Sequence, residues 1–259
     1  MLKKKNIILQ DIIIRNMLTL YLKEIKEFFS SITGYLVIIV FLLVNSMFMW
    51  IFRGSFNVFD LGVANIDTLF TISPWLFLFL VPAITMNMFA SELKSGTMEL
   101  LLTRPLSEFQ IVFAKYLAAV TLVLIALIPT LFYLFSIHSL AAPVGNVDFG
   151  AILGSYIGLF FLAAVYSAIG IFASSLSKNA IISFLLSVLL CYIFFLGFNN
   201  LAFLGFTGKV SDFIISLGIN DHYRSISRGV IDSRDIVYFL SVISIFVFLA
   251  KLRLESRKW

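Results

Sequence analysis

Charged residues are scarce in this chain of 259 residues. They make up 13% of the sequence, and apolar residues make up 61%, whereas soluble domains carry about 25% charged residues. This composition excludes an ordinary soluble domain. Because each helical span needs about 20 apolar residues, it predicts an all-α integral membrane protein with several membrane spans.

The chain also has little of the chemistry that enzymes use. Its single cysteine, Cys191, can form no intrachain disulfide and lies in an apolar run, where a small core residue is expected. Its two histidines, His138 and His222, belong to no zinc-binding pattern. The phosphate-binding loop G-x-x-x-x-G-K-[ST] is missing. We therefore expect no catalytic, cofactor-binding or metal-binding residues in this chain.

The net charge of +5 does not point to nucleic acid, because the charges are distributed between apolar blocks and do not form one basic patch. An even number of spans, here six, puts both termini on one side of the membrane.

The distribution of basic residues indicates which side this is. With the termini inside, the inner segments hold 14 Lys and Arg and the outer segments hold five, so both termini are predicted to be cytosolic. The six apolar blocks that predict spans are 34–52, 73–90, 110–137, 150–173, 180–198 and 236–250.

Two charged segments flank the spans of residues 34–251. Residues 1–33 form a predicted cytosolic segment, and residues 252–259 form a predicted cytosolic basic tail. The first contains a predicted amphipathic helix at 17–29, suited to membrane lipid, although a surface helix of a soluble cap would show the same pattern. Its apolar side includes Leu18, Tyr21, Leu22, Ile25 and Phe28.

The fourth predicted span carries three glycines four residues apart, Gly150, Gly154 and Gly158. Small residues at this spacing let helix backbones approach closely. The spacing alone leaves two partners open, which are another helix of the same chain and a helix of a second copy.

The one long external segment lies at 199–235 and predicts two short amphipathic helices. Short helices at the outer membrane interface fit best, and ordinary loop helices are the alternative. The first would be capped by Ser211 and end at Gly218. The second would be capped by Asn220 or Asp221 and reach Gly229.

The stretch at 91–115 is the longest polar interruption on the predicted cytosolic side, and it contains the loop at 91–106. Gly96 and Thr97 can start a helix, and Pro105 disfavours helix at the residue before it. A short helix at 98–102 follows. This helix suits a protein groove, while a tight loop on the membrane surface is the alternative. Its rim consists of the charged residues Glu92, Lys94, Glu99, Arg104 and Glu108.

The start of the third span is specified by Ser107 and Gln110, which predict a capping box. A helix that begins near Glu108 and runs for about 30 residues at about 1.5 Å each is longer than the bilayer core of about 30 Å. We expect it to project into the cytosol and to carry Lys115 near the headgroups. Pro129 predicts a local kink in it.

One stretch also resembles a known family. The run that starts at Glu92, E-x-x-x-G-T-M-E-L-L-L-T-R-P-L-S, with a following Lys-Tyr at 115–116, resembles the loop between the second and third spans of ABC transporter permeases of the type-2 exporter class. The likeness is closest to gliding-motility-associated permease subunits. Two further stretches resemble that subgroup, KEIKEFFSSITGYLVIIVFLLVNSMFMWIF at 23–52 and HYRSISRGVIDSRDIVYF at 222–239.

The resemblance implies a multi-pass permease subunit of an ATP-driven exporter in a bacterial cytoplasmic (inner) membrane. The loop helix would be a coupling helix seated in a separate ABC ATP-binding subunit, which would bind ATP and Mg. The helix at 17–29 would be the interface helix beside it. Such permeases act as dimers, which implies a second permease chain, identical or a sister. The implied coupling residues are Glu92, Gly96, Thr97, Glu99, Arg104 and Pro105.

A second hypothesis comes from another class of protein. The chain could be a membrane anchor, or a mechanical or assembly component of an envelope machine, powered by the partner ATPase without solute transport. A periplasmic or auxiliary membrane protein would then bind the segment at 199–235. The likeness to gliding-associated permeases keeps this hypothesis open, and it predicts ATP hydrolysis without movement of a substrate.

Overall fold

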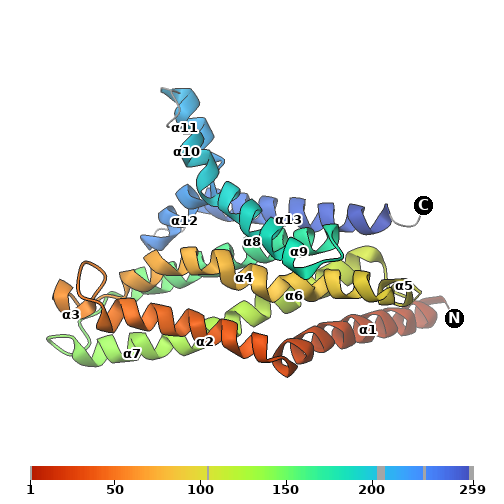
Figure 1. The fold of residues 1–259 in the computed structure, drawn as a ribbon, viewed down its shortest axis with the longest axis horizontal. Helices are drawn as coiled ribbons and strands as arrows, with labels where there is room; N and C mark the ends of the chain where they lie inside the picture. Colours follow the sequence, from red (N-terminus) through yellow and green to blue (C-terminus); the bar gives the residue numbers. More distant parts are fainter. Residues whose placement is uncertain (1, 104, 203–207, 230–231, 257–259) are drawn as a thin grey trace.

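The protein is a bundle of long helices (Figure 1). The computed structural model describes residues 2–103, 105–202, 208–229 and 232–256, with side chains from residue 13 onward. Within these residues, all regular structure is helical, and six helical segments are long and apolar enough to cross a membrane. These segments confirm the prediction of an all-α membrane protein with six spans. They are Ile32–Ile51, Asp67–Ser95, Glu108–Leu140, Phe149–Leu176, Ala180–Ala202 and Ser233–Glu255.

The spans are built from the following helices. The first is α2 (Ile32–Ser46) with the π-helix η1 (Met47–Ile51), and the second is α4 (Asp67–Ser95). The fourth is α8 (Phe149–Leu176), and the sixth is α13 (Ser233–Glu255). The fifth consists of α9 (Ala180–Tyr192), the π-helix η3 (Ile193–Gly197) and α10 (Phe198–Ala202).

The third span consists of α6 (Glu108–Leu127), the 3₁₀ turn η2 (Ile128–Thr130) and α7 (Leu131–Leu140). Both bonds of the predicted capping box are present, with Gln110 N donating to Ser107 Oγ at 3.3 Å and Ser107 N donating to Gln110 Oε1 at 2.9 Å. Pro129 lies in η2, where the α-helical hydrogen bonding is interrupted. With 33 residues, this span is longer than a bilayer core requires.

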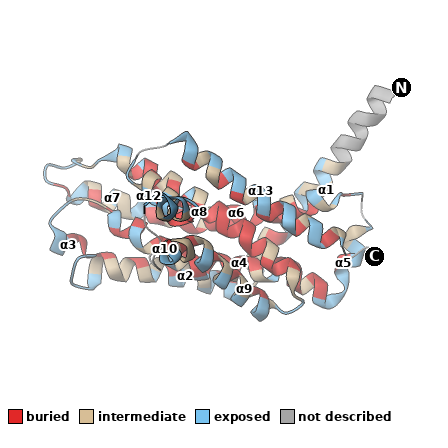
Figure 2. Ribbon diagram, turned by 90° about the horizontal axis from the view of Figure 1, so that it is seen from above, coloured by how far each residue is buried: buried red, intermediate tan, exposed pale blue. Residues whose placement is uncertain are grey.

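Three spans form the centre of the bundle and three lie at its periphery (Figure 2). The buried share of the most apolar stretch is 78% for α8, 67% for the third span and 61% for α4, but 33% for α13 and 22% for both α2 and the fifth span. The peripheral helices therefore present apolar side chains outward, as helices in contact with membrane lipid do.

The helix α1 (Leu2–Ser30) contains the predicted amphipathic helix and continues from it toward the N-terminus. It ends before Ser31, which caps α2 by accepting a hydrogen bond from Gly34 N at 3.2 Å. In Figure 1, α1, the end of α13 and the short helix α5 (Thr97–Leu102) lie at one end of the bundle, and the short helix α3 (Val58–Leu61) and α7 lie at the other.

The segment after the fifth span holds α11 (Lys209–Ser216) and α12 (Ile219–Ser227). The predicted caps are wrong, because Gly208 precedes α11 and Gly218 precedes α12. The residues Ser211, Asn220 and Asp221 lie inside the helices. The helix α11 begins three residues earlier than a cap at Ser211 requires, and α12 begins two residues earlier than a cap at Asn220 requires. Figure 1 shows α10 and α11 standing away from the bundle, and α11 has no buried residue.

By contrast, α12 packs into the bundle through its buried residues Ile219, Tyr223 and Ile226. Its contact with α8 is close, since a Cβ atom added to Gly154 would lie 2.7 Å from Gly229 Cα, and one added to Gly158 would lie 3.4 Å from Ile226 Cγ2. A Cβ on Gly150 would meet only Asp148 Oδ1, at 3.3 Å. Two of the three glycines therefore lie against another helix of the same chain.

Candidate functional site

The loop between α4 and α6 presents the helix α5 at the end of the bundle. Gly96 adopts φ of +74°, a left-handed conformation that glycine adopts without steric strain, and so separates α4 from α5. Met98 is buried and holds α5 to the bundle, whereas the Leu100 side chain is 68% exposed. An exposed leucine on a short helix between two spans is available to a protein partner.

Most of the residues implied in coupling surround this leucine. The side chains of Thr97, Glu99 and Pro105 are exposed, as is Gly96. Arg104 lies outside the described residues. The exposed set therefore combines two apolar side chains, those of Leu100 and Pro105, with one hydroxyl and one carboxylate.

Glu92 does not line the rim of this surface, where the sequence placed it. Its side chain points into the protein and is 9% exposed. The reason is helical spacing, because Glu92 follows the buried residues Met88 and Phe89 of α4 by four and three positions and shares their side of the helix.

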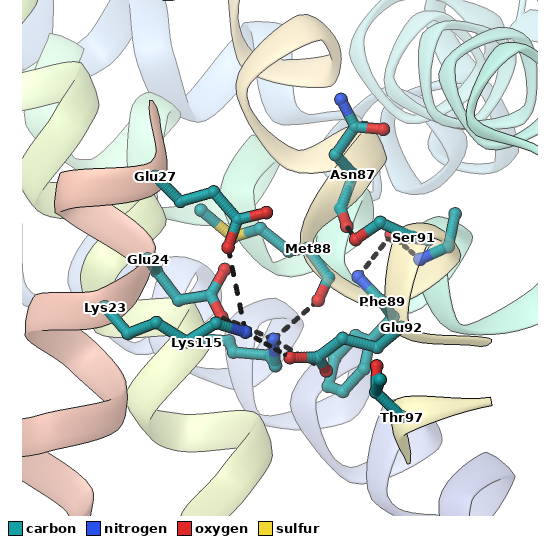
Figure 3. Close-up of polar contacts among 12 residues, drawn as sticks. Lys23, Glu24, Glu27, Asn87, Met88, Phe89, Ser91, Glu92, Thr97 and Lys115 are labelled. Carbon is teal, nitrogen blue, oxygen red and sulfur yellow. Dashed lines mark hydrogen bonds and ion pairs between the residues drawn. The ribbon is translucent and has the colours of Figure 1, made fainter. Parts of the chain in front are cut away.

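Glu92 belongs to a group of four charged residues, Lys23, Glu24, Glu92 and Lys115, which we name the charge cluster (Figure 3). Lys23 Nζ donates to Glu92 Oε1 at 2.6 Å, and Lys115 Nζ donates to Glu24 Oε1 at 2.6 Å. Lys115 Nζ also lies 3.0 Å from Glu92 Oε2, an ion pair that lacks hydrogen-bond geometry. Within the cluster two cations face two anions, and Lys23 also lies 3.7 Å from the exposed carboxylate of Glu27. The cluster joins α1, α4 and α6.

Lys115 is the centre of the charge cluster. Its side chain is 0% exposed, so its charge is compensated by protein groups and not by water. In addition to the two carboxylates, its ammonium donates to the Met88 carbonyl at 2.6 Å and lies 5.1 Å from the ring centroid of Phe89. The lysine expected near the headgroups is therefore a buried link between α6 and the last turns of α4.

The same part of α4 is held from a second side by α8. Ser174 Oγ accepts hydrogen bonds from the backbone N–H groups of Phe89 at 3.0 Å and Ala90 at 3.2 Å, and it donates to the Met86 carbonyl at 3.0 Å. The segment that leads into α5 is thus fixed to α1, α6 and α8 at once.

Lys23 is the exposed member of the charge cluster, with 48% of its side chain accessible. Partial burial by itself lowers the pKa of a lysine, but the hydrogen bond to Glu92 and the nearby carboxylates of Glu24 and Glu27 outweigh it and raise the pKa of Lys23 above its usual value. This ammonium therefore stays charged at neutral pH. Its contribution to stability is fully present below the ordinary lysine pKa and is lost as the pH rises from that value through the raised pKa.

The residues of the predicted interface helix divide between two environments. Tyr21, Ile25 and Phe28 pack against the core, and Tyr21 Oη donates to Thr121 Oγ1 of α6 at 3.0 Å. Leu18 and Leu22 are 52% and 42% exposed. The exposed pair is separated by one turn and lies on one side of α1, where it can contact lipid.

The pairing of Glu24 with Lys115 was missed by the sequence analysis. A signal was present, since Glu24 follows Leu20 and Tyr21 and precedes Phe28 at helical spacing, and so occupies a core position of α1. An acid at such a position needs a buried cation as its partner. The sequence offered several cations and did not identify the one on α6.

The fold and the site define a polytopic helical membrane protein in which two of the three central spans, α4 and the third span, are joined by a short helix with an exposed side. Residues 18–259 match the family described as ABC-2 family transporter protein, and the chain belongs to this family. It is thus the membrane-embedded permease component of an ABC transporter, a component that requires a separate ATP-binding partner. Comparison with curated proteins gives no match.

Proposed function

We propose that this chain couples ATP hydrolysis by its ATP-binding partner to export of a substrate across a bacterial cytoplasmic membrane. In this proposal α5 is the coupling helix and Leu100 inserts into a cleft of the partner. The partner binds ATP and Mg, and two permease chains form the translocation unit. The main observation behind the proposal is the exposure of Leu100 on α5. This short helix is continuous with the last turns of α4, which are bonded to α1, α6 and α8.

In this proposal the charge cluster transmits movement from α4 to the neighbouring helices. When the partner subunits close on ATP, α5 is pushed or rotated, and α4 moves with it because only Gly96 separates the two helices. The ion pairs of Glu92 with Lys23 and Lys115 then carry the displacement into α1 and α6. Residues Thr97, Glu99, Arg104 and Pro105 fix the orientation of α5 in the cleft.

Replacing Leu100 by glutamate tests the docking step. We expect Leu100→Glu to weaken association with the ATP-binding subunit by about 2 kcal/mol, or about 30-fold, because it places a charge in an apolar cleft at the centre of the interface. The measurement is copurification of the two subunits, together with the ATPase rate of the complex in lipid nanodiscs. Because Leu100 is exposed, the melting temperature of the isolated permease should stay unchanged.

Val144→Glu is the matched control, since Val144 is 72% exposed at the opposite end of the bundle. This variant should retain both the partner and its ATPase rate. Equal behaviour of the two variants would contradict docking through α5, whether both lose the partner or both keep it.

The proposed link to gliding motility rests on the resemblance of residues 23–52 and 222–239 to gliding-associated permeases. Deletion of the gene in its native host, followed by measurement of cell movement on a surface, tests it. If the deletion strain loses movement, it is complemented with either the unmodified gene or the gene that carries Leu100→Glu. Movement restored by the unmodified gene alone would support both the link to gliding and the coupling step. Unimpaired movement in the deletion strain would refute the link.

A further inference from the structure

A pocket of about 580 Å³ opens at the end of the bundle opposite to α5. Its walls come from the first turns of α4, from α8, from η3 and from α12. A pocket of this size can hold a small molecule or the head of a larger one.

One wall of the pocket carries polar groups without partners. Arg224 and Arg228 lie four residues apart on α12 and its C-cap, both are exposed, and neither forms a salt bridge with a described residue. Asn220, one turn before Arg224, is 5% exposed as a residue, its side-chain amide makes no hydrogen bond within the described residues, and the amide atoms are not enclosed but open to the pocket. An amide that opens to a pocket and has no protein partner is free to bind a ligand or water there.

The opposite wall is apolar and aromatic. Trp75 of α4 is 48% exposed and meets the edge of the Phe195 ring at a centroid distance of 6.1 Å. Phe70 and Pro74 extend this wall along α4. A tryptophan beside a polar wall, at the end of a membrane span, is suited to a molecule with one polar and one apolar part.

The polar wall is held rigidly. Tyr223 Oη donates to the Phe70 carbonyl at 2.6 Å, and Ser155 Oγ donates to the Ser227 carbonyl at 2.7 Å. His222 lies between Asp235 Oδ1 at 2.7 Å and the Ser216 carbonyl at 2.9 Å, stacked on Tyr238. Because α12 is fixed to α4, α8 and α13, its donors are preorganised for a ligand.

The charge of the pocket sets the sign of that ligand. Two arginines against one carboxylate, that of Asp67, leave a net charge of +1. Asp67 already accepts a hydrogen bond from Asn65 Nδ2 at 2.9 Å. The guanidinium groups therefore attract an acidic group, and Asp67 can accept a hydroxyl or amine of the same molecule.

We propose that this pocket binds an anionic amphiphile, with its phosphate or carboxylate on Arg224, Arg228 and Asn220 and its apolar chain against Trp75 and Phe195. The molecule comes either from the surrounding bilayer, as an acidic phospholipid, or from the solution, as a free amphiphilic anion. The proposal goes beyond the coupling function and does not depend on docking of α5.

Quenching of Trp75 fluorescence by brominated amphiphiles tests the proposal. Trp50→Phe and Trp259→Phe leave Trp75 as the only tryptophan of the chain. The quenching of Trp75 is measured in three kinds of nanodisc. The first contains brominated phosphatidylglycerol, the second contains brominated phosphatidylcholine, and the third contains phosphatidylcholine to which 11-bromoundecanoate is added. The pocket variant is Arg224→Gln with Arg228→Gln. The matched control is Arg53→Gln with Arg234→Gln, two exposed arginines that do not line the pocket.

We expect an anionic quencher to bind the unmodified pocket and the control about tenfold or more tightly than the pocket variant, since charge-assisted hydrogen bonds to two guanidinium groups are lost. Selective quenching by brominated phosphatidylglycerol assigns the site to a bilayer lipid. Selective quenching by 11-bromoundecanoate alone assigns it to an anion from solution. Equal quenching by zwitterionic and anionic probes, or quenching that the pocket variant leaves unchanged, would overturn the proposal.

Discussion

Lys115→Met should destabilise the permease by about 3–5 kcal/mol, because it leaves the buried carboxylates of Glu24 and Glu92 without their shared cation. Lys115 is 0% exposed, so water cannot take over its role. The measurement is the thermal or denaturant midpoint of the purified chain in nanodiscs. We also expect the Met88 carbonyl of α4 to lose its contact with α6.

The matched control for this prediction is Lys251→Met. Lys251 forms an ion pair of 3.1 Å with Glu255, but the two side chains are 29% and 39% exposed, so its loss should cost about 0–1 kcal/mol. Adding Glu24→Gln and Glu92→Gln to Lys115→Met should recover part of the lost stability, because no buried charge is then unpaired. Equal costs for the two lysines would show that Lys115 is hydrated and that the charge cluster is not buried.

Gly170→Ala should destabilise the bundle by about 1–3 kcal/mol through overpacking at the centre of the fold. A Cβ atom on Gly170 of α8 would overlap Thr85 Oγ1 of α4 and lie 2.9 Å from Thr85 Cβ. Both helices are among the most buried in the chain, so neither can move away freely. The readout is again the unfolding midpoint.

A second substitution shows whether Thr85 is the cause. Thr85→Ala removes the Oγ1 and Cγ2 atoms that the new methyl group would meet, so the double variant Gly170→Ala with Thr85→Ala should be more stable than the sum of the single effects implies. Gly150→Ala is the control, since its Cβ would contact only Asp148 Oδ1. Additive effects, or a cost as small as that of Gly150→Ala, would refute the close contact between α4 and α8.

The number and order of the spans follow from local properties of the chain. An apolar run of sufficient length forms a helix in a bilayer whatever surrounds it, because its backbone groups must bond within the segment. The capping box at Ser107 and Gln110 is local as well, and so is the break at Gly96. For these features, the sequence predictions and the structure agree.

The site was only partly accessible from the sequence. The short helix α5 could be predicted because Gly96 and Pro105 limit it on either side. The inward orientation of Glu92 and its pairing with Lys115 could not, since they depend on which sides of α1, α4 and α6 face one another. The caps expected at Ser211 and at Asn220 or Asp221 were also wrong, because the cap positions are Gly208 and Gly218.

By itself, the sequence determined a six-span helical membrane protein with an exposed loop helix between the second and third spans, because apolar length, capping residues and glycine act within a few residues. Only the tertiary structure decided that Lys115 is buried between Glu24 and Glu92, that α12 packs on Gly154 and Gly158, and that Arg224 and Arg228 face a pocket with Trp75. Those features join residues that are distant along the chain, and their energies depend on burial and proximity, which a linear pattern does not specify.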